Sequence, residues 1–167
     1  AIADEVRAAV QAVQGTGALL FINDHWREAI AAGAYGVHLG QEDLDALPAP
    51  ALQELRASGL RLGVSTHGYA EMLRADAVGP SYLALGAVFP TTLKRMATAP
   101  QGVARLAAYA RLMQASYPLV AIGGIALEQF GPVRATGVGS IAVVRALVAA
   151  PDPEAAAAQL LRAMASA

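Results

Sequence analysis

The sequence predicts an α/β fold built on a parallel sheet, and two patterns support that prediction. The first is a set of short apolar runs without polar alternation, which is typical of strands covered on both faces. The second is a stretch of helical character between each run and the next, which favours parallel strands joined by right-handed crossovers. The expected strands are Ala18–Ile22, Gly36–Leu39, Leu62–Ser65, Tyr82–Gly86, Leu119–Ile122 and Ser140–Val144.

The expected helices take their places between these strands, with one in front of the first strand. They are Ile2–Val13, His25–Ala32, Ala51–Ser58, Tyr69–Ala77, Val103–Ala115, Leu127–Ala135 and Pro153–Ala165. Asp152 is a suitable N-cap for the last of them, with Pro153 at its first helical position. Other helices end shortly before a glycine that can adopt the left-handed conformation at a helix C-terminus: Gly33, Gly59, Gly79 and Gly137.

The length of the strand–helix repeat indicates a (β/α) barrel. One repeat takes roughly 20–25 residues, which is usual for a (β/α)8 TIM barrel and short for a doubly wound sheet. Such a barrel needs eight strands and at least about 200 residues. The chain has 167 residues and begins with a helix. We therefore expect a single domain over residues 1–167, either a barrel with two strands missing or an open sheet.

Composition excludes several classes of protein. The net charge of -1 gives no basic footprint for nucleic acid, and the absence of cysteine excludes disulfides and thiolate metal sites. The mean hydropathy of +0.43 raises the question of membranes. However, the apolar stretches are shorter than a spanning helix, and Asp4 and Glu5 do not fit a signal peptide. We expect a soluble, cytoplasmic domain with neither a nucleic acid nor a membrane as partner.

Small or polar residues follow every expected strand, at the edge where parallel α/β folds bind ligands. The only asparagine of the chain, Asn23, and its only lysine, Lys94, both fall at this edge. Because loop positions often carry function, the edge is a candidate ligand site. Its residues are Asn23-Asp24, Gly40-Gln41, Ser65-Thr66-His67, Gly86 with Pro90–Lys94, Gly123-Gly124, and Arg145.

Two carboxylates at this edge have two interpretations. Asp24 and Asp43 follow neighbouring strands, and together with phosphate oxygens they could bind Mg²⁺. Alternatively, Asp24 caps the helix that begins at His25, and Asp43 caps a turn. Spacing alone favours the capping roles.

The other candidates at the edge suit an anion. Gly123-Gly124 precedes a helix and could bring backbone N–H groups to a phosphate, although such a pair is also common in chain reversals. Lys94 lies on a loop with Thr91 and Thr92, so that an ammonium group and two hydroxyls could bind a phosphate. The alternative for Lys94 is an ordinary solvated lysine.

The histidines and large aromatic residues point less strongly to a function than the residues at the sheet edge do. His25 and His38 are expected to be structural, and Trp26 and Phe130 to pack in the core. His67 follows Ser65 by two residues, a pair that could serve acid–base chemistry. Since no third residue is evident to orient His67, a hydrolase triad is not expected. The chain also lacks G-x-G-x-x-G and G-x-x-x-x-G-K-[ST] motifs.

Taken together in order, five segments resemble the successive motifs of the thiamine phosphate synthase family. The resemblance runs from about residue 18 to about residue 150 and corresponds to the third to eighth strands of that family's (β/α)8 TIM barrel. Each motif alone is weak, but the set in this order is specific. The segments are residues 20–24 (LFIND), 36–43 (GVHLGQED), 63–67 (GVSTH), 86–94 (GAVFPTTLK) and 121–125 (AIGGI).

The resemblance implies a Mg²⁺-dependent transferase that joins a pyrimidine methyl diphosphate to a thiazole phosphate, giving thiamine phosphate and pyrophosphate. Asp24 and Asp43 would hold Mg²⁺, while Asn23, Ser65 and Lys94 would contact the pyrimidine substrate. Ser65 and Lys94 are the residues expected to act in catalysis. The residues expected to border the thiazole phosphate are Thr91, Thr92, Leu93, Gly124, Val144 and Arg145.

The chain departs from the family pattern at three places. Leu93 stands where a second threonine is frequent, and Arg145 stands where a serine is usual. Arg145 could bind phosphate itself or point outward. The family's early Gln-x-Arg-x-Lys motif, which grips the diphosphate, has no counterpart here, so it is open whether the 167 residues alone are active. We expect a fragment of a longer gene product or pairing with another chain, for example as a homo-oligomer.

Two other functions compete with this interpretation. The related thiazole tautomerase branch shares the barrel and can use a histidine where His67 stands, but it needs no Mg²⁺. The other is a non-catalytic module that binds phosphate or thiamine phosphate. Metal dependence separates the first rival from the synthase, and calorimetry with thiamine phosphate and pyrophosphate separates the second.

Overall fold

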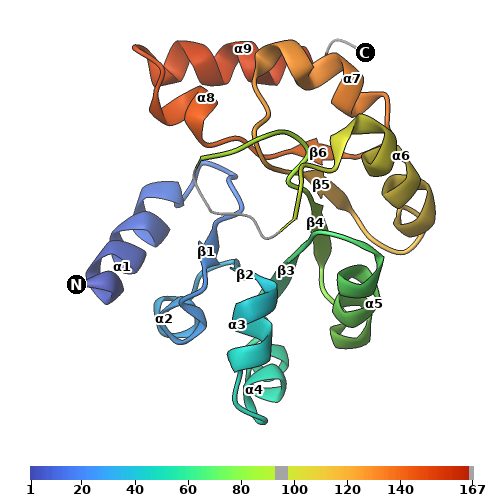
Figure 1. Cartoon of the computed structure of the whole chain (residues 1–167). Helices are drawn as coiled ribbons and strands as arrows, with labels where there is room; N and C mark the ends of the chain where they lie inside the picture. The colour runs from blue at the N-terminus through green and yellow to red at the C-terminus, as the bar shows by residue number, and fades with distance from the viewer. Residues whose placement is uncertain (93–97, 166–167) are drawn as a thin grey trace. The chain divides into compact units, whose positions relative to one another are not determined.

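The computed structural model describes residues 1–92 and 98–165 of the chain (Figure 1). Across these residues, six strands follow one another in the sheet in chain order. The pairings β1–β2, β2–β3, β4–β5 and β5–β6 are parallel, which confirms the predicted fold class. The strands are β1 (Phe21–Asn23), β2 (Gly36–Leu39), β3 (Arg61–Thr66), β4 (Tyr82–Leu85), β5 (Leu119–Ala121) and β6 (Ser140–Ile141).

The helices agree with the prediction to within about two residues at most ends, which is the usual uncertainty of helix boundaries. The predicted helices are α1 (Ile2–Val13), α2 (Trp26–Ala32), α4 (Ala51–Ser58), α5 (Tyr69–Val78), α6 (Gly102–Met113), α7 (Phe130–Arg134) and α9 (Pro153–Ala165). A 3-10 turn, η1 (Leu127–Gln129), replaces the start of the helix expected from Leu127. Two short helices, α3 (Gln41–Ala46) and α8 (Arg145–Val148), were not predicted.

The four glycines predicted to end helices and the predicted N-cap of the last helix are confirmed. Gly33, Gly59, Gly79 and Gly137 all have a positive φ, between 64° and 94°. At Gly33 the left-handed residue turns the chain from α2 toward β2, a conformation that costs other residues about 1–2 kcal/mol. At the start of α9, the backbone N–H of Ala155 donates to Asp152 Oδ1 at 2.9 Å, so Asp152 is the N-cap.

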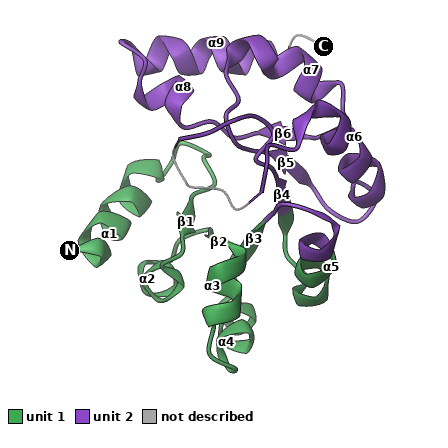
Figure 2. Cartoon of the chain, in the orientation of Figure 1, with its two compact units in different colours: residues 1–65, 73–82 green, residues 66–72, 83–167 purple. Residues whose placement is uncertain are grey.

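The chain divides into two compact units, which Figure 2 colours separately. Unit 1 is residues 1–65 and 73–82. It holds α1, α2, α3, α4, strands β1 and β2, nearly all of β3, and the C-terminal part of α5. Unit 2 is residues 66–72 and 83–167, and it holds the later elements together with the first turn of α5.

In unit 1 the sheet separates an apolar face from a polar one. Asn23 is the register partner of His38, and His38 is the partner of Gly63. Because residues alternate along a strand, Ser65 shares the face of Gly63. The opposite face presents Ile22, Val37, Leu39 and Val64, all buried. Trp26 lies in the same core, 7% exposed, which confirms its packing role.

Unit 2 has its own buried core. Its strands contribute Leu83, Leu85, Leu119 and Ala121, each at most 3% exposed. Helices α6 and α7 add apolar side chains to this core, among them Leu106, Tyr109, Phe130 and Val133. Phe130 is therefore a packing residue, as predicted. Burial of most of β4 and β5 explains why their sequences show no polar alternation.

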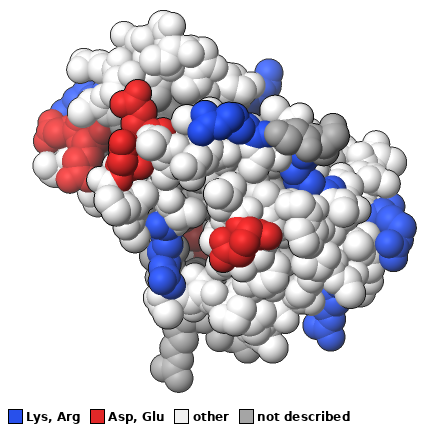
Figure 3. All heavy atoms as spheres, turned by 90° about the horizontal axis from the view of Figure 1, so that it is seen from above, with Lys and Arg blue, Asp and Glu red and all other residues white. Residues whose placement is uncertain are grey.

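The surface carries charges of both signs. Figure 3 shows acidic and basic side chains interspersed with uncharged surface on the face in view. Within residues 1–92 and 98–165, no helix is both long and apolar enough to cross a membrane.

Candidate functional site

The carboxyl end of β1 places Asn23 and Asp24 at the predicted edge. Asp24 has a φ of 64°, and no other non-glycine residue in the described part of the chain has a positive φ. Its backbone N–H donates to the carbonyl oxygen of His38 at 2.9 Å, which fixes the turn against β2. Aspartate tolerates this left-handed conformation better than most residues, and such strain is frequent at functional sites.

Asp43 lies in the first turn of α3, directly after β2. Its Oδ2 accepts a hydrogen bond from the backbone N–H of Gly40 at 3.0 Å, so the capping role considered for Asp43 is present. A carboxylate has more lone pairs than this bond uses, so capping and metal binding are compatible. Mg²⁺ is usually held by one or two carboxylates together with substrate phosphates and water. The carboxylates of Asp24 and Asp43 fit that donor set, and within residues 1–92 and 98–165 no group of three or more His, Cys, Asp or Glu side chains could hold a metal.

Ser65 is joined to His38 and Tyr82 by a chain of hydrogen bonds. His38 Nε2 lies 2.8 Å from Ser65 Oγ, and His38 Nδ1 lies 2.7 Å from Tyr82 Oη. Burial lowers the pKa of His38, and the negative charge of Asp43 opposes this shift. Burial also raises the pKa of Tyr82 to about 12. Both shifts favour the neutral forms of these side chains near neutral pH.

Two glycines make room for the aromatic rings of this cluster. A Cβ on Gly63 would lie 2.2 Å from the Tyr82 ring, and one on Gly36 would lie 2.4 Å from the Phe21 ring. The Phe21 and Tyr82 rings meet edge to face with centroids 5.0 Å apart. Tyr82 thus reaches His38 because its ring lies over the bare backbone of Gly63.

Gln41 fixes the backbone at the end of β3. Its Nε2 donates to the carbonyl oxygen of Ser65 at 2.8 Å. Gln41 Oε1 is buried and meets no hydrogen-bond donor among the described residues. Ser65 is therefore held at its backbone by Gln41 and at its hydroxyl by His38.

The Ser65–His67 pair considered from the sequence is not formed. Ser65 bonds His38 instead, and His67 has its own partner. Its Nδ1 lies 2.7 Å from Glu71 Oε2, which also accepts the backbone N–H of His67 at 2.8 Å. The expectation that no residue orients His67 was wrong, because Glu71 lies four residues on, at the start of α5, where a side chain can turn back toward the strand end.

In unit 2 the segment after β4 lies along the segment after β5. Val88 N–H donates to the carbonyl oxygen of Ile122 at 2.9 Å, and Phe89 N–H donates to that of Gly123 at 3.0 Å. Gly124 has a φ of 68°, and a Cβ there would lie 2.4 Å from the carbonyl oxygen of Pro90. Only glycine combines a positive φ with so close an approach to Pro90, so the Gly123-Gly124 pair is more than a routine turn.

Arg145 faces the same loop. Its Nη1 donates to Thr92 Oγ1 at 3.3 Å, so that the side chain turns toward Thr92. Val144, 52% exposed, precedes it at the start of α8. Leu93 and Lys94 lie outside the described residues.

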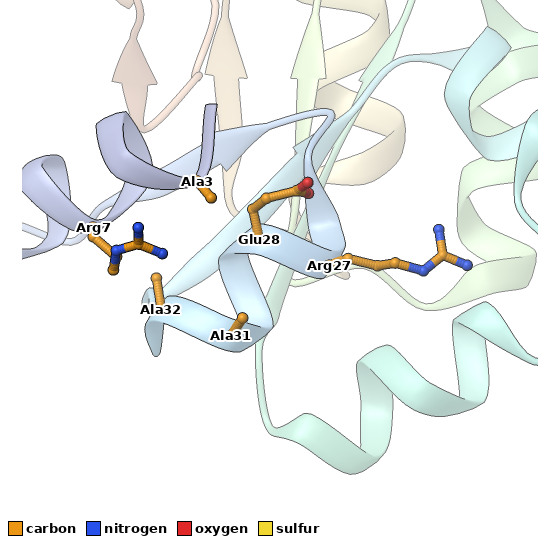
Figure 4. Close-up of a pocket in the computed structure, with 6 residues that line it drawn as sticks. All are labelled: Ala3, Arg7, Arg27, Glu28, Ala31 and Ala32. Atoms are coloured by element: carbon orange, nitrogen blue, oxygen red, sulfur yellow. The ribbon is translucent and has the colours of Figure 1, made fainter. Parts of the chain in front are cut away.

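Two pockets of unit 1 lie elsewhere. One, of about 220 Å³, opens between α1 and α2 and is lined by Arg7, Glu28 and alanines; in Figure 4 the Arg27 side chain extends away from the others. The guanidinium carbon Cζ of Arg27 lies over the Trp26 ring, 4.1 Å from the ring centroid. A second, of about 480 Å³, is lined by Leu20, Gly33, Gly59 and Arg61, at the amino ends of the strands. Neither of these two pockets includes a predicted site residue.

The site residues therefore form two sets. In unit 1 the structure joins Ser65 to His38 and His38 to Tyr82. His38 and Tyr82 were not among the predicted site residues. In unit 2 it brings Thr92 to Arg145 and packs Gly124 against the loop of Pro90. His38 could have been found by aligning the strand ends, because that alignment places it beside Gly63 and on the face of Ser65.

Parallel strands joined by helices, with polar residues and close-packed glycines at their carboxyl ends, are typical of the α/β-barrel class of enzymes, whose active sites lie at that edge. The comparisons with known proteins identify the family within this class. The family described as thiamine monophosphate synthase matches residues 1–147. The chain belongs to the thiamine-phosphate synthase family.

Relatives and a solved structure agree with this assignment. The chain is 56% identical to the thiamine-phosphate synthase of Neisseria meningitidis serogroup A, over 90% of this chain and 72% of the relative. It is 57% identical to that of Salmonella enteritidis, over 94% of this chain and 72% of the relative. The solved thiamine phosphate pyrophosphorylase of Pyrococcus furiosus superimposes with a TM-score of 0.85 at 32% identity, covering 99% of this chain and 76% of that one.

Proposed function

We propose that this chain acts as a thiamine-phosphate synthase in thiamine biosynthesis, in the cytoplasm. The reaction joins 4-amino-2-methyl-5-hydroxymethylpyrimidine diphosphate to thiazole phosphate and releases pyrophosphate. The observation that supports this most directly is identity above 50% to synthases over nine-tenths of the chain. Ser65 and Gly124, which the motifs assign to the substrates, are held in defined positions by a hydrogen bond and by close backbone packing respectively, which supports this assignment.

The pyrimidine diphosphate is assigned to Asn23, Ser65 and Lys94. Asn23 ends β1 on the face that it shares with His38, and Ser65 lies on the same face of β3. An amide and a hydroxyl there can hydrogen-bond the acceptor atoms of a pyrimidine. Lys94 would meet the diphosphate as a positive charge.

Mg²⁺ would be held by Asp24 and Asp43. When bound, it neutralises negative charge on the diphosphate. The turn of Asp24 and the capping bond of Asp43 to Gly40 fix the two backbones from which these carboxylates extend. The protein thus supplies two carboxylates on fixed backbone, and the diphosphate supplies oxygens of its own.

The thiazole phosphate is assigned to residues of unit 2. Thr91, Thr92 and Leu93 would border it on one loop, Gly124 on the next, and Val144 with Arg145 beyond. A guanidinium beside a threonine hydroxyl, as Arg145 lies beside Thr92, can bind phosphate oxygens with two donors. Arg145 would then replace the serine that is usual at this position.

The chemistry demands charge stabilisation rather than covalent catalysis. The C–O bond between the pyrimidine methylene and the diphosphate breaks, and both electrons leave with pyrophosphate. The thiazole nitrogen then donates its lone pair to the methylene cation and forms the C–N bond. The roles left to the protein are to orient both substrates and to neutralise charge on the leaving group, as Lys94 would do.

Pyrophosphate release tests the proposal. The full-length protein, supplied with both substrates and Mg²⁺, is expected to release pyrophosphate and thiamine phosphate in equal amounts. Omitting the thiazole phosphate, or removing the metal with a chelator, should stop product formation. A folded protein that forms no thiamine phosphate under these conditions would contradict the proposal.

A second candidate activity, proton transfer like that of the thiazole tautomerase relatives, is favoured by one contact. Glu71 orients the His67 imidazole at the end of β3, as an acid–base histidine requires. A tautomerase would isomerise the thiazole without a metal. Turnover of the thiazole that persists in a chelator and is lost in His67→Gln would favour this activity.

A further inference from the structure

We propose that His38 is a positioning residue for the synthase reaction, whose Nε2–H holds the Ser65 oxygen so that the serine hydroxyl hydrogen points to the pyrimidine substrate. Tyr82 sets this arrangement by fixing the tautomer of the imidazole. The role of Ser65 rests on the proposed function, whereas the tautomer of His38 does not.

The first step is the order of the three groups. The imidazole lies in the middle, with Nδ1 2.7 Å from Tyr82 Oη and Nε2 2.8 Å from Ser65 Oγ. A neutral imidazole has one donor and one acceptor nitrogen, so only two hydrogen-bond directions are available along the chain. Either Tyr82 donates inward and Nε2–H donates to Ser65, or Ser65 donates inward and Nδ1–H donates to Tyr82.

The second step concerns where the hydroxyl hydrogen of Tyr82 is donated. Within the described residues, His38 Nδ1 is the one hydrogen-bond partner of Tyr82 Oη. Each direction leaves one hydroxyl hydrogen without an acceptor among these residues: that of the phenol in the second direction and that of the half-buried serine in the first. A phenol is a stronger acid than an aliphatic hydroxyl and therefore the better hydrogen-bond donor to an imidazole nitrogen, which favours the first direction. The first direction satisfies the phenol. With its pKa raised to about 12, Tyr82 keeps this hydrogen at neutral pH.

The third step is the rigidity of the tyrosine. Its ring lies over Gly63, packs edge to face on Phe21, and stacks on His38 with an interplanar angle of 24°. A hydroxyl on a ring held from three sides offers its hydrogen in a fixed direction. The imidazole is therefore oriented by packing as well as by its hydrogen bond.

The consequence falls on Ser65. Its oxygen accepts from His38 Nε2–H, and its backbone carbonyl accepts from Gln41. The hydroxyl hydrogen then remains for an acceptor of the substrate, such as a ring nitrogen or a diphosphate oxygen. In the opposite direction the serine hydroxyl would donate its hydrogen to His38 Nε2, and toward the substrate it could only accept a hydrogen bond.

The tautomer can be measured without substrate. The chain has three histidines, so ¹⁵N-labelled histidine gives few signals, and loss of one set in His38→Gln assigns them. We expect a proton on Nε2 of His38 and the shift of a hydrogen-bond acceptor on Nδ1. Tyr82→Phe should move the Nδ1 signal, whereas Tyr35→Phe, which alters another tyrosine packed on Phe21, should not. A proton on Nδ1, or on both nitrogens, would overturn the proposal.

Kinetics test whether His38 acts through Ser65. Glutamine can place an amide nitrogen near the position of Nε2, so His38→Gln should retain more activity than His38→Leu. Loss of an orienting partner of this kind commonly costs about 10–100-fold in activity. We expect kcat to fall by about tenfold or more in His38→Leu and to fall less in Tyr82→Phe.

The decisive comparison repeats these changes in Ser65→Ala. If His38 acts through the serine, His38→Leu should lower kcat no further in that background. An equal fold-loss with and without the serine hydroxyl would overturn the proposal. A wild-type protein that forms no product would instead contradict the proposed function, and the tautomer would still be measurable.

Discussion

The two units place their candidate site residues by different physical means. In unit 1, side chains hold side chains: Tyr82 fixes His38, and His38 fixes Ser65. In unit 2, backbone packs on backbone: Gly124 lies where a Cβ would be 2.4 Å from the carbonyl oxygen of Pro90. A hydrogen-bonded network can be changed one group at a time, whereas a close backbone contact depends on having no side chain at all.

Gly63 and Gly124 make the contrast clearest, because a Cβ at each would be crowded by a different kind of atom. At Gly63 the neighbouring atoms belong to the Tyr82 side chain, which would have to leave its packed position but could do so without moving the backbone. At Gly124 they are the backbone atoms of Phe89 and Pro90, which cannot move without the loop. We therefore expect a side chain at Gly63 to disturb the positioning of Tyr82, and a side chain at Gly124 to cause a loss of structure in its loop.

The largest effect is expected from Lys94→Ala. The prediction comes from sequence, since Lys94 is the only lysine of the chain and falls on the loop with Thr91 and Thr92. Removing a charge that neutralises the leaving diphosphate should lower kcat by about 10²–10³-fold. The free energy of unfolding should change by less than about 0.5 kcal/mol, as at ordinary surface positions. Arg111→Ala, an exposed change on α6, is the control for loss of a positive charge.

Next in size is Gly124→Ala, which tests the backbone contact of unit 2. Alanine would carry both the cost of a left-handed φ and that of overpacking, together about 2–5 kcal/mol of unfolding free energy. Gly33→Ala is a matched control, because its φ of 66° is close to the 68° of Gly124 but nothing lies within 4 Å of its Cβ. That control should lose only about 1–2 kcal/mol. Equal losses in chemical denaturation would show that the close contact does not matter.

A smaller effect is expected from Gly63→Ala, which tests unit 1. The new methyl group should push the Tyr82 ring away from His38, at a cost of about 1–3 kcal/mol. Gly68→Ala, with open space around its Cβ, should stay within about 0.5 kcal/mol of the wild type. The histidine ¹⁵N spectrum gives the specific readout: the Nδ1 signal of His38 should shift in the first variant only. An unchanged Nδ1 signal in Gly63→Ala would show that the absence of a side chain at Gly63 does not set the position of the Tyr82 ring.

The smallest change in stability is expected from Arg145→Ala. The bond from Arg145 to Thr92 is 3.3 Å long and exposed, so its loss should alter the free energy of unfolding by less than about 0.5 kcal/mol. The KM for thiazole phosphate should nevertheless rise severalfold, while the KM for the pyrimidine diphosphate stays near the wild-type value. Unchanged KM values for both substrates would indicate that Arg145 only braces the loop.

Periodicity and strand-end residues predicted most of the fold. The apolar runs located every strand, although β1 begins three residues later and β6 ends three residues earlier than predicted. The glycines marked the helix ends, because both signals depend on local sequence. The short helix α3 was missed because its sequence, QEDLDA, offers no apolar face of helical period. The bond from Ser65 to His38 was missed for another reason: it joins residues 27 apart, and only the sheet register brings them together.

In the proposed assignment, Ser65 of unit 1 binds the pyrimidine diphosphate and Thr92 of unit 2 binds the thiazole phosphate. Steady-state kinetics of Ser65→Ala and Thr92→Val, with each substrate varied in turn, test it most directly. We predict a crossed result: Ser65→Ala raises the KM for the pyrimidine diphosphate alone, and Thr92→Val raises the KM for the thiazole phosphate alone. Equal effects of either variant on both KM values, or no effect on any, would contradict the assignment.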